Sequence, residues 1–556
     1  MSTSIDYDSK KEDPSAYYAQ EGVVEPVVLE DANPATQHYA VKRVMTTRQI
    51  QFYAIGGTIG TAVFVSIGAN LLKSGPLFLL LGYIIWCSVI YCVNEGQGIM
   101  VSRIARESAF TRFATSYVDE AFGFATGVNY FIQTCSLLCF EVTALHGVIG
   151  FWYELHPAIM PCICLVAYFS LHVWSSRWFA ESEFWIVLGK IVLMIMLFMF
   201  TFVTMVGGNP LKDAYGFRYW KNPGPISEFY GTGHSAQLRA FLASILGAAF
   251  AVAGPDMLSL ISAEAINPRK VLPGAFRSVY VRLIIFFLAS ALAVGIVVGS
   301  EDEILTNAVA NGLPGAGRSP YVAAMTRMKI GVLPHIVNAG IASSIFSAGS
   351  AFLFGASRTL HGLALDGYAP KFLRKTNKNG VPHRTVLVVL AVMCLSFLQV
   401  SAGSTVVLDW FINISTSSQI VTWMAMSVTF IRFHKACKVQ GVSMDDMPYR
   451  SRLQPYAAWY ALSLSSVVLL INGYPVFLKG GWSTPDFIFA YAAPIIFIIA
   501  FIGWKAIHRK RWVKSSEAQL YEGLEEIEAH EEELALLGLD KEISNKWYHR
   551  LTRWLF

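Results

Sequence analysis

The chain has 556 residues, of which 54% are hydrophobic and only 15% are charged. Soluble domains average about 25% charged residues, so a composition this apolar, with its hydrophobic residues in long runs, argues against a soluble globular protein. The formal net charge of +5 is small, and we expect no nucleic-acid partner.

Long apolar runs recur between Ile50 and His508. A helix needs about 20 mostly apolar residues to cross a bilayer. Residues 1–45 are polar and lack the apolar stretch of a secretory signal, so the first span is expected to act as its own insertion signal. We predict an all-α integral membrane protein with about 12 transmembrane helices, near residues 50–72, 76–100, 124–149, 157–177, 184–206, 237–262, 278–300, 333–363, 384–402, 405–433, 457–478 and 487–508.

Positive charge is concentrated in one set of the predicted loops. An even number of spans places both termini on one side of the membrane, and loops rich in Lys and Arg are usually cytoplasmic. The rich loops contain Arg103, Arg106, Arg112, Arg269, Lys270, Arg277, Lys371, Arg374, Lys375, Lys378, Arg432, Lys435, Lys438, Arg450 and Arg452. We therefore expect both termini in the cytoplasm.

The C-terminal segment from Ser515 to Lys546 is rich in Glu and Leu and can form an amphipathic helix. The plain interpretation is a solvated tail. The alternative is a docking site for trafficking or degradation factors such as a ubiquitin ligase, with Lys10 and Lys11 as possible ubiquitin acceptors.

Two predicted spans contain residues that interrupt a helix. The first span includes Gly56, Gly57 and Gly60, and the sixth includes Gly254 followed by Pro255. A helix break in hydrocarbon frees polar backbone groups, and it survives only where it lines a cavity or is buried in protein. Breaks at corresponding positions of two halves indicate a transporter binding site.

The two breaks expose backbone groups of opposite polarity. These groups are the amides of Gly60, Thr61 and Ala62 and the carbonyls of Phe250, Ala251 and Ala253. Amides at the start of a half-helix suit a carboxylate, and carbonyl oxygens suit an ammonium group, so together they predict a site for a zwitterionic α-amino acid. Alternatively, the glycines only allow the helices to pack closely.

Ionisable residues lie at membrane depth, where a charge costs at least roughly 2.5–3.5 kcal/mol. Glu141, Lys190 and Asp256 are the candidates for proton coupling, because burial disfavours their charged forms and so suits proton uptake and release. Lys190 can instead take the place of a sodium ion or snorkel to the interface. Glu141 can be a hydrogen-bonding residue between helices, and Asp256 a structural partner of the neighbouring break.

No other chemistry is indicated by the sequence. The paired cysteines Cys135/Cys139 and Cys162/Cys164 lack a His or carboxylate set to complete a metal site. No nucleophile–base set or phosphate loop lies outside the spans. We expect no enzymatic activity, no metal and no cofactor, with a proton gradient as the driving force.

The chain resembles a fungal amino acid permease of the yeast amino acid transporter family, within the amino acid–polyamine–organocation superfamily. The resemblance runs from about Thr46 to Arg511 and rests on several motifs. They are Arg48-Gln49-Ile50-Gln51, Gly56-Gly57-Thr58-Ile59-Gly60-Thr61, Phe122-Gly123-Phe124-Ala125, Glu183-Phe184-Trp185, Ala263-Glu264-Ala265-Ile266-Asn267-Pro268-Arg269-Lys270, Ser357-Arg358-Thr359-Leu360 and Pro448-Tyr449-Arg450-Ser451.

The resemblance implies a five-plus-five inverted repeat of the LeuT type, with broken helices one and six and two further helices. It implies a cytoplasmic tail over 1–45, a transport core of ten spans over 46–433, spans eleven and twelve over 434–508, and a second cytoplasmic tail over 509–556. It also implies amino acid import by proton symport and alternating access at the plasma membrane. Phe250 would act as an aromatic gate, and Lys190 would face Ser343, Ser344 and Ser347.

The chain departs from the family pattern at the breaks. Ala62 replaces the usual glycine and adds a methyl group at the carboxylate pole, and Gly254-Pro255-Asp256 replaces the usual Gly-Thr-Glu. The amino acid that is carried does not follow from the sequence. The alternatives are a permease for an amine such as choline, GABA or a polyamine, and an amino acid sensor built on the same fold.

Overall fold

The computed structural model describes residues 43, 45, 47–174, 176–310, 319–478 and 480–536. Over these residues the regular structure is helical, apart from one isolated bridge between Met45 and Ala265. The prediction of an all-α fold is therefore confirmed.

Helices coincide with each of the twelve predicted spans. The first five spans are α3 (Thr47–Gly56) with the π-helical η1 (Ala62–Ser66) and the start of α4 (Ile67–Arg103), the rest of α4, α6 (Glu120–Ile149), α7 (Ile159–Val173) and α8 (Ser176–Met205). The next five are α9 (His234–Ala251) with α10 (Pro255–Ile261), α11 (Pro268–Arg282) with η4 (Leu283–Leu288) and α12 (Ala289–Val297), α15 (Leu333–Leu365), α16 (His383–Met393) with η7 (Cys394–Leu398) and α17 (Gln399–Ala402), and α18 (Ser404–Gln440). The last two are α19 (Tyr456–Ile471) and α20 (Thr484–His508).

Shorter helices lie between the spans and after them. They are α5 (Ala109–Tyr117), η2 (Arg218–Trp220), η3 (Ser262–Glu264), α13 (Glu303–Ala310), α14 (Pro320–Arg327), η6 (Lys371–Arg374), η8 (Met444–Asp446), η9 (Tyr474–Phe477) and α21 (Leu524–Leu536). The first two spans meet inside α4, where Gly75 has φ 76° and leaves helical geometry just before Pro76. Only glycine adopts this backbone conformation readily, so Gly75 sets the turn between the spans.

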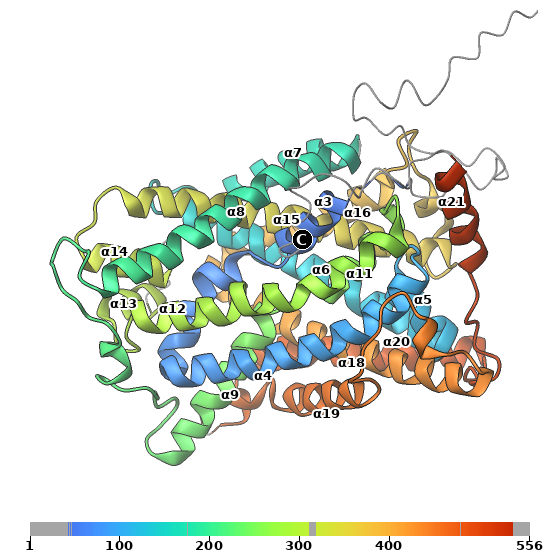
Figure 1. Cartoon of the computed structure of the whole chain (residues 1–556). Coiled ribbons are helices and arrows are strands. Elements are labelled where there is room, and N and C mark those ends of the chain that lie inside the picture. The colour runs from blue at the N-terminus through green and yellow to red at the C-terminus, as the bar shows by residue number, and fades with distance from the viewer. Residues whose placement is uncertain are drawn as a thin grey trace, which may run out of the picture.

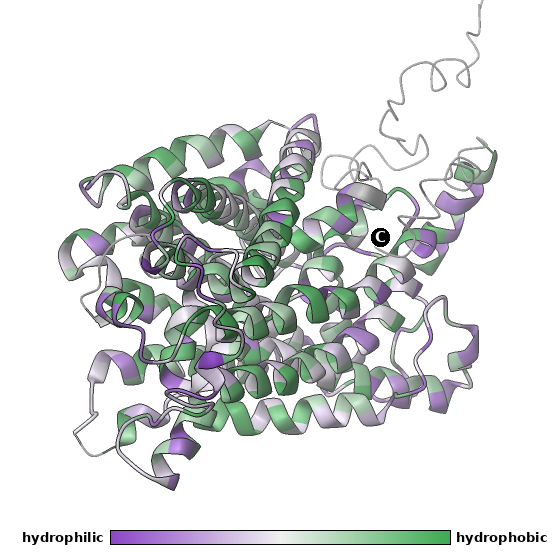
Figure 2. Ribbon diagram, turned by 60° about the vertical axis from the view of Figure 1, so that its left-hand side comes forward, coloured by the Kyte–Doolittle hydropathy of each residue, from purple (hydrophilic) through white to green (hydrophobic). Residues whose placement is uncertain are grey.

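The bundle exposes large apolar side chains around its sides. Val192, Phe202 and Ile499 are each about 60% exposed or more, and apolar residues follow the helices along their length (Figure 2). Eight helices among the described residues are long and apolar enough to cross a membrane, and α7 and α19 are shorter apolar helices. Side chains of this kind on the outside of the bundle suit contact with lipid, so the chain is a multi-pass membrane protein.

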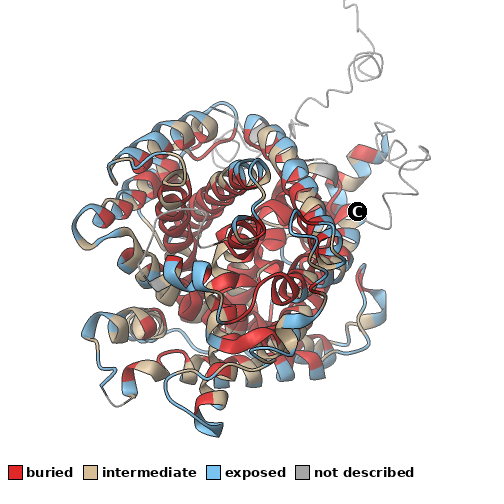
Figure 3. Ribbon diagram, turned by 90° about the vertical axis from the view of Figure 1, so that its left-hand side faces the viewer, coloured by how far each residue is buried: buried red, intermediate tan, exposed pale blue. Residues whose placement is uncertain are grey.

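The buried centre of the bundle is built around two long helices. α6, the third span, packs along α15, the eighth. Buried residues gather in the middle of the bundle when it is seen along its length (Figure 3). α18, the tenth span, packs on α6, and α8, the fifth, packs on α15. In two repeats of five spans, span three corresponds to span eight, and span five corresponds to span ten. The contact between spans three and ten therefore corresponds to the contact between spans eight and five, as expected for such repeats.

The bundle has two ends, which we name by the segments found there. The loop face carries the loop 206–233, the segment 299–310 and residues 473–478. The tail face carries Arg43, α5, the loop 366–380 and the segment 509–536, and α21 and α5 lie at the same end of the bundle in Figure 1.

The segment 513–536 is docked on the tail face. Val513 N donates to Val118 O over 3.1 Å, Arg269 pairs with Glu531 over 2.9 Å, and Ile527 and Leu534 are each 1% exposed. The interpretation of a solvated tail is therefore wrong for these residues, because α21 buries an apolar face against the bundle. Lys10, Lys11 and residues 537–556 lie outside the described residues.

The docked tail carries a pH-sensitive contact that we predict weakens in acid. Burial lowers the pKa of His530 below its usual 6.5, and Arg43 acts in the same direction against the opposing effects of Ile266 O and Glu533. The docked state favours the neutral imidazole, whose Nε2 lies 2.9 Å from Ile266 O, so docking should be fully stable above pH 6.5 and lose stability as the pH falls below it.

Hydrogen-exchange protection factors of residues 524–536 in the purified protein at pH 7.5 and 5.5 check this expectation. Protection should fall at pH 5.5. The matched variant His530→Gln can keep a donor near Ile266 O but does not titrate, so it should show equal protection at both values. Equal protection of the wild-type tail at the two pH values would contradict the prediction.

Candidate functional site

The first span is interrupted between Gly56, where α3 ends, and Ala62, where η1 begins. Lys190 reaches this gap from α8. Its Nζ donates to Gly56 O over 2.6 Å and to Ile59 O over 3.0 Å, and Ser344 Oγ also donates to Ile59 O over 3.1 Å. The carbonyl groups released by the break are therefore bound by a side-chain ammonium and a hydroxyl.

Two glycines of the first break allow buried carboxylates to approach the backbone. A Cβ atom at Gly56 would collide with the Glu183 carboxylate, and one at Gly60 would lie 2.5 Å from Glu141 Oε1. A residue with a side chain does not fit at either position without displacing a carboxylate. The glycines at the break therefore also allow the close packing of the neighbouring carboxylates.

Lys190 belongs to a buried charge cluster. Its side chain is 2% exposed, and it interacts electrostatically with Glu183 and Glu141, which are equally buried. Ser347 Oγ donates to Glu183 Oε1 over 2.7 Å. Buried charges are tolerated only when they are paired and hydrogen-bonded, and this cluster meets both conditions. Ser343, the third serine expected near Lys190, is exposed and lies on another side of α15.

Glu141 lies at the free backbone amides of the first break, near Thr61, which we call the amide pole. Thr61 Oγ1 donates to Glu141 Oε2 over 2.5 Å, and Thr61 N lies 3.4 Å from both carboxylate oxygens. This is the place where the sequence predicts the carboxylate of a substrate. The protein thus fills the position with a carboxylate of its own.

The second break lies between Ala251, where α9 ends, and Pro255, where α10 begins. Asp256 Oδ1 accepts from Gly254 N over 3.3 Å, and Asp256 Oδ2 accepts from Tyr130 OH over 3.0 Å. Asp256 is 1% exposed. These contacts hold its carboxylate at the start of α10, where the partial positive charge of the helix end also favours it.

Gln419 is a further side chain at the second break. Its Nε2 donates to Val252 O over 3.4 Å. A side chain of α18 thus binds a carbonyl group next to those that the sequence analysis predicted to bind an ammonium group. Ala251 is buried and Ala253 is partly exposed.

A cavity of about 750 Å³ extends from the two breaks to the loop face. Thr61, Ala62, Phe140 and Phe250 line its deep end, and Lys73 and Tyr230 line it near the loop face. The rings of Phe140 and Phe250 meet edge to face with centroids 5.0 Å apart. This volume accommodates a small organic molecule such as an amino acid.

The predicted site residues therefore divide into two groups. Thr61, Ala62 and Phe250 share the cavity wall. The other predicted residues form the backbone and buried contacts of the two breaks behind that wall, and they are Gly56, Gly57, Gly60, Glu141, Lys190, Ala251, Ala253, Gly254, Pro255 and Asp256.

Sequence reasoning gave no role in the site to three residues of this arrangement, Glu183, Tyr130 and Gln419. Glu183 carried a usable signal, because it precedes Lys190 by seven residues and two helical turns place both on one face. Tyr130 and Gln419 carried none, since their partners lie more than 100 residues away in the chain.

Comparison with known proteins shows what this chain is similar to. The sequence profile of a family described as amino acid permease matches residues 49–517. The general amino acid permease AGP2 of Saccharomyces cerevisiae is 39% identical over 88% of this chain and 84% of its own length. A proline-specific permease of Emericella nidulans is 33% identical over 98% and 100%, and a dicarboxylic amino acid permease of Saccharomyces cerevisiae is 32% identical over 93% and 85%.

The match of the family profile covers both helix breaks, the buried lysine and the cavity between them. The relatives match most of the chain and are named as permeases, which are transporters and not enzymes. This chain, with its helical membrane-spanning fold, belongs to the amino acid permease family.

Proposed function

We propose that this protein imports an amino acid across the plasma membrane by proton symport and alternating access. Membership of the amino acid permease family gives the class of transport. The observation that carries the finer proposal is the first break, where Lys190 and Glu141 bind the freed backbone groups beside the cavity.

In this proposal the two breaks hold the two charged groups of the substrate. The carboxylate binds the amides near Gly60, Thr61 and Ala62, and the ammonium binds carbonyls of the second break at Phe250, Ala251 and Ala253. Phe250 closes over the bound substrate together with Phe140, since both rings line the deep end of the cavity.

Proton coupling follows from the position of Glu141. An ionised Glu141 and a substrate carboxylate repel each other at the same amide pole. Proton uptake by Glu141 removes this repulsion and releases Thr61 for the substrate. Lys190 keeps the broken span in place where other carriers hold a sodium ion, and Asp256, held by Tyr130 and Gly254, is the third candidate for proton exchange.

The orientation of the protein follows from the distribution of positive charge. The tail face carries most of the Lys and Arg residues of the loops, so we assign it and both termini to the cytoplasm. The cavity then faces the outside, and the structure corresponds to a state that receives substrate from there.

The substrate class stays open within this proposal. Relatives of nearly equal identity are named for different amino acids, since the proline-specific permease is 33% identical and both the dicarboxylic and the basic amino-acid permease are 32% identical. Overall similarity therefore does not select the side chain, and the direct test is a panel of substrates.

Uptake of labelled amino acids into permease-deficient cells tests the proposed function. We expect at least one of the twenty amino acids to accumulate against its gradient, and a protonophore to abolish this accumulation. The panel also includes choline, GABA and polyamines, because the sequence left amines open. Absence of uptake of every compound by a protein present at the cell surface would contradict transport and favour a sensor.

Replacement of Lys190 by Ala should abolish concentrative uptake. The change removes the Lys190 donor from Gly56 O and leaves Ile59 O with Ser344 Oγ, and it takes away the positive partner of Glu183. Lys190→Met, which keeps most of the side-chain volume, should have the same effect. The exposed loop residue Lys221 provides the control Lys221→Ala, which should transport normally.

Surface biotinylation must accompany these uptake measurements. Normal surface amounts of Lys190→Met without accumulation would support the coupling role. Loss of both Lys190 variants from the membrane would instead indicate that Lys190 only supports packing.

A bulky residue at Thr61 should weaken substrate binding. Thr61→Leu removes the hydroxyl bound to Glu141 and narrows the amide pole at the cavity wall. The KM should rise by about tenfold or more, because a hydrogen bond to a charged group contributes about 1.5–3 kcal/mol. Val192→Leu, on α8 and 60% exposed, does not line the cavity and should leave KM unchanged. A normal KM for Thr61→Leu would place the site elsewhere.

A further inference from the structure

The path from the breaks toward the tail face is closed around buried charges. A void of about 10 Å³ lies there, lined by Glu107, Ser108, Glu264, Arg358 and His361 among others. This is at most the space of one water molecule. The 750 Å³ cavity lies on the other side of the breaks and is far wider.

An ion pair between the sixth and the eighth span crosses this closed region. Arg358 Nε on α15 donates to Glu264 Oε1 over 2.7 Å, and the two side chains are only 7% and 3% exposed. The Arg358 guanidinium lies 4.3 Å from the ring centroid of Phe354. Glu264 Oε2 is buried and accepts no hydrogen bond from the residues that the structure describes.

The backbone of Glu264 is hydrogen-bonded to the start of the first span, on the tail-face side of the two breaks. Met45 N donates to Glu264 O over 2.8 Å, and Ile266 N donates to Met45 O over 3.2 Å. Met45 leads into α3 and Glu264 follows α10, which are the halves of spans one and six on the tail-face side. One residue thus binds both half-helices to each other and, through Arg358, to α15.

A buried ion pair is well suited to a contact that opens and closes. A buried ion pair loses much of its attraction to desolvation, and well-packed apolar residues often stabilise a closed structure as well or better. When the contact opens, both charged groups recover their hydration, whereas apolar surfaces would be exposed to water at a cost. The unpartnered Oε2 of Glu264 would also gain hydrogen bonds in the open state.

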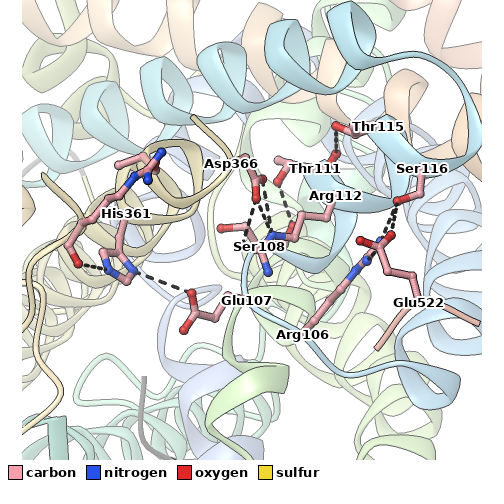
Figure 4. Close-up of polar contacts among 12 residues, drawn as sticks. Arg106, Glu107, Ser108, Thr111, Arg112, Thr115, Ser116, His361, Asp366 and Glu522 are labelled. Carbon is pink, nitrogen blue, oxygen red and sulfur yellow. Dashed lines mark hydrogen bonds and ion pairs between the residues drawn. The ribbon is translucent and has the colours of Figure 1, made fainter. Parts of the chain in front are cut away.

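We infer that the Glu264–Arg358 pair is the gate that closes the tail-face end of the substrate path. The inference rests on the proposed function, in which that end faces the cytoplasm, and adds residues that bind neither substrate nor proton. A second contact lies one helical turn along α15, where His361 Nδ1 is 3.7 Å from Glu107 Oε2 (Figure 4).

The gate is tested by the accessibility of a cysteine introduced beside the void. Ala263→Cys is placed in a background in which the exposed Cys162 and Cys394 are replaced by Ser. A membrane-impermeant maleimide is applied to the cytoplasmic side of inside-out vesicles. Arg358→Gln should raise the labelling of this cysteine several-fold, because the two half-helices separate from α15 more often.

A second reporter distinguishes gate opening from general loosening. Ala243→Cys lines the cavity and is labelled from the outside in intact cells. Opening of the tail-face end by Arg358→Gln should lower this labelling, because alternating access closes the other end. A structural defect would raise the labelling of both reporters, and that result would overturn the inference.

Two further variants provide the controls. The exchange Glu264→Arg with Arg358→Glu keeps an ion pair and should return both labelling values toward those of the unaltered gate. Asp366→Asn removes the nearby pair with Arg112, whose atoms are 3.0 Å apart on the same face (Figure 4), and should change neither value. Equal changes with Asp366→Asn, or no recovery in the exchanged pair, would overturn the inference.

The conservative variant Arg358→Lys keeps the positive charge and should give intermediate labelling if Arg358→Gln does not reach the membrane. If a variant with a disrupted pair shows unchanged labelling and still accumulates amino acids, the inferred gate would be contradicted but the proposed transport would not. Altered labelling in a protein that transports nothing would keep the gate and remove the proposed function.

Discussion

The bond between the Lys190 ammonium and the carbonyl groups of Gly56 and Ile59 is the contact on which the rest of the structure depends. In hydrocarbon, an unsatisfied backbone group costs several kcal/mol, so an interrupted helix needs a partner for every freed group. Lys190 supplies that partner from α8. The fifth span and the break in the first span therefore form one unit, and a movement of either span changes the contacts of the other.

The same break places opposite charges within a small buried volume. Glu183 and Glu141 approach the chain at Gly56 and Gly60, where no side chain blocks them. Glu141 accepts a hydrogen bond from Thr61 at this break. In the proposed function, the carboxylate of a substrate replaces this contact, and occupation of the cavity is thereby connected to the charge state of Glu141. This arrangement is compatible with membership of the amino acid permease family.

The two ends of the bundle are closed to different degrees. On the loop face a wide cavity reaches the breaks, whereas the void among the paired charges on the tail-face side is about 10 Å³ in volume. The segment 513–536 adds a further layer there, since His530 contacts Ile266, which lies between η3 and α11, and Glu531 contacts Arg269 in the first turn of α11. In the proposed alternating-access cycle, a change of access therefore involves the ion pairs at this end as well as the helix breaks.

The sequence by itself determined where the apolar helices and the two breaks lie, because apolar run length and the local effects of Gly and Pro are properties of neighbouring residues. It also placed Lys190 and Glu141 at membrane depth. Only the tertiary structure decided that Glu141 fills the amide pole, that Ser344 and not Ser343 faces the break, and that α21 docks on the bundle. Each of these depends on how helices distant in the chain rotate and pack against one another, and no local pattern encodes that rotation.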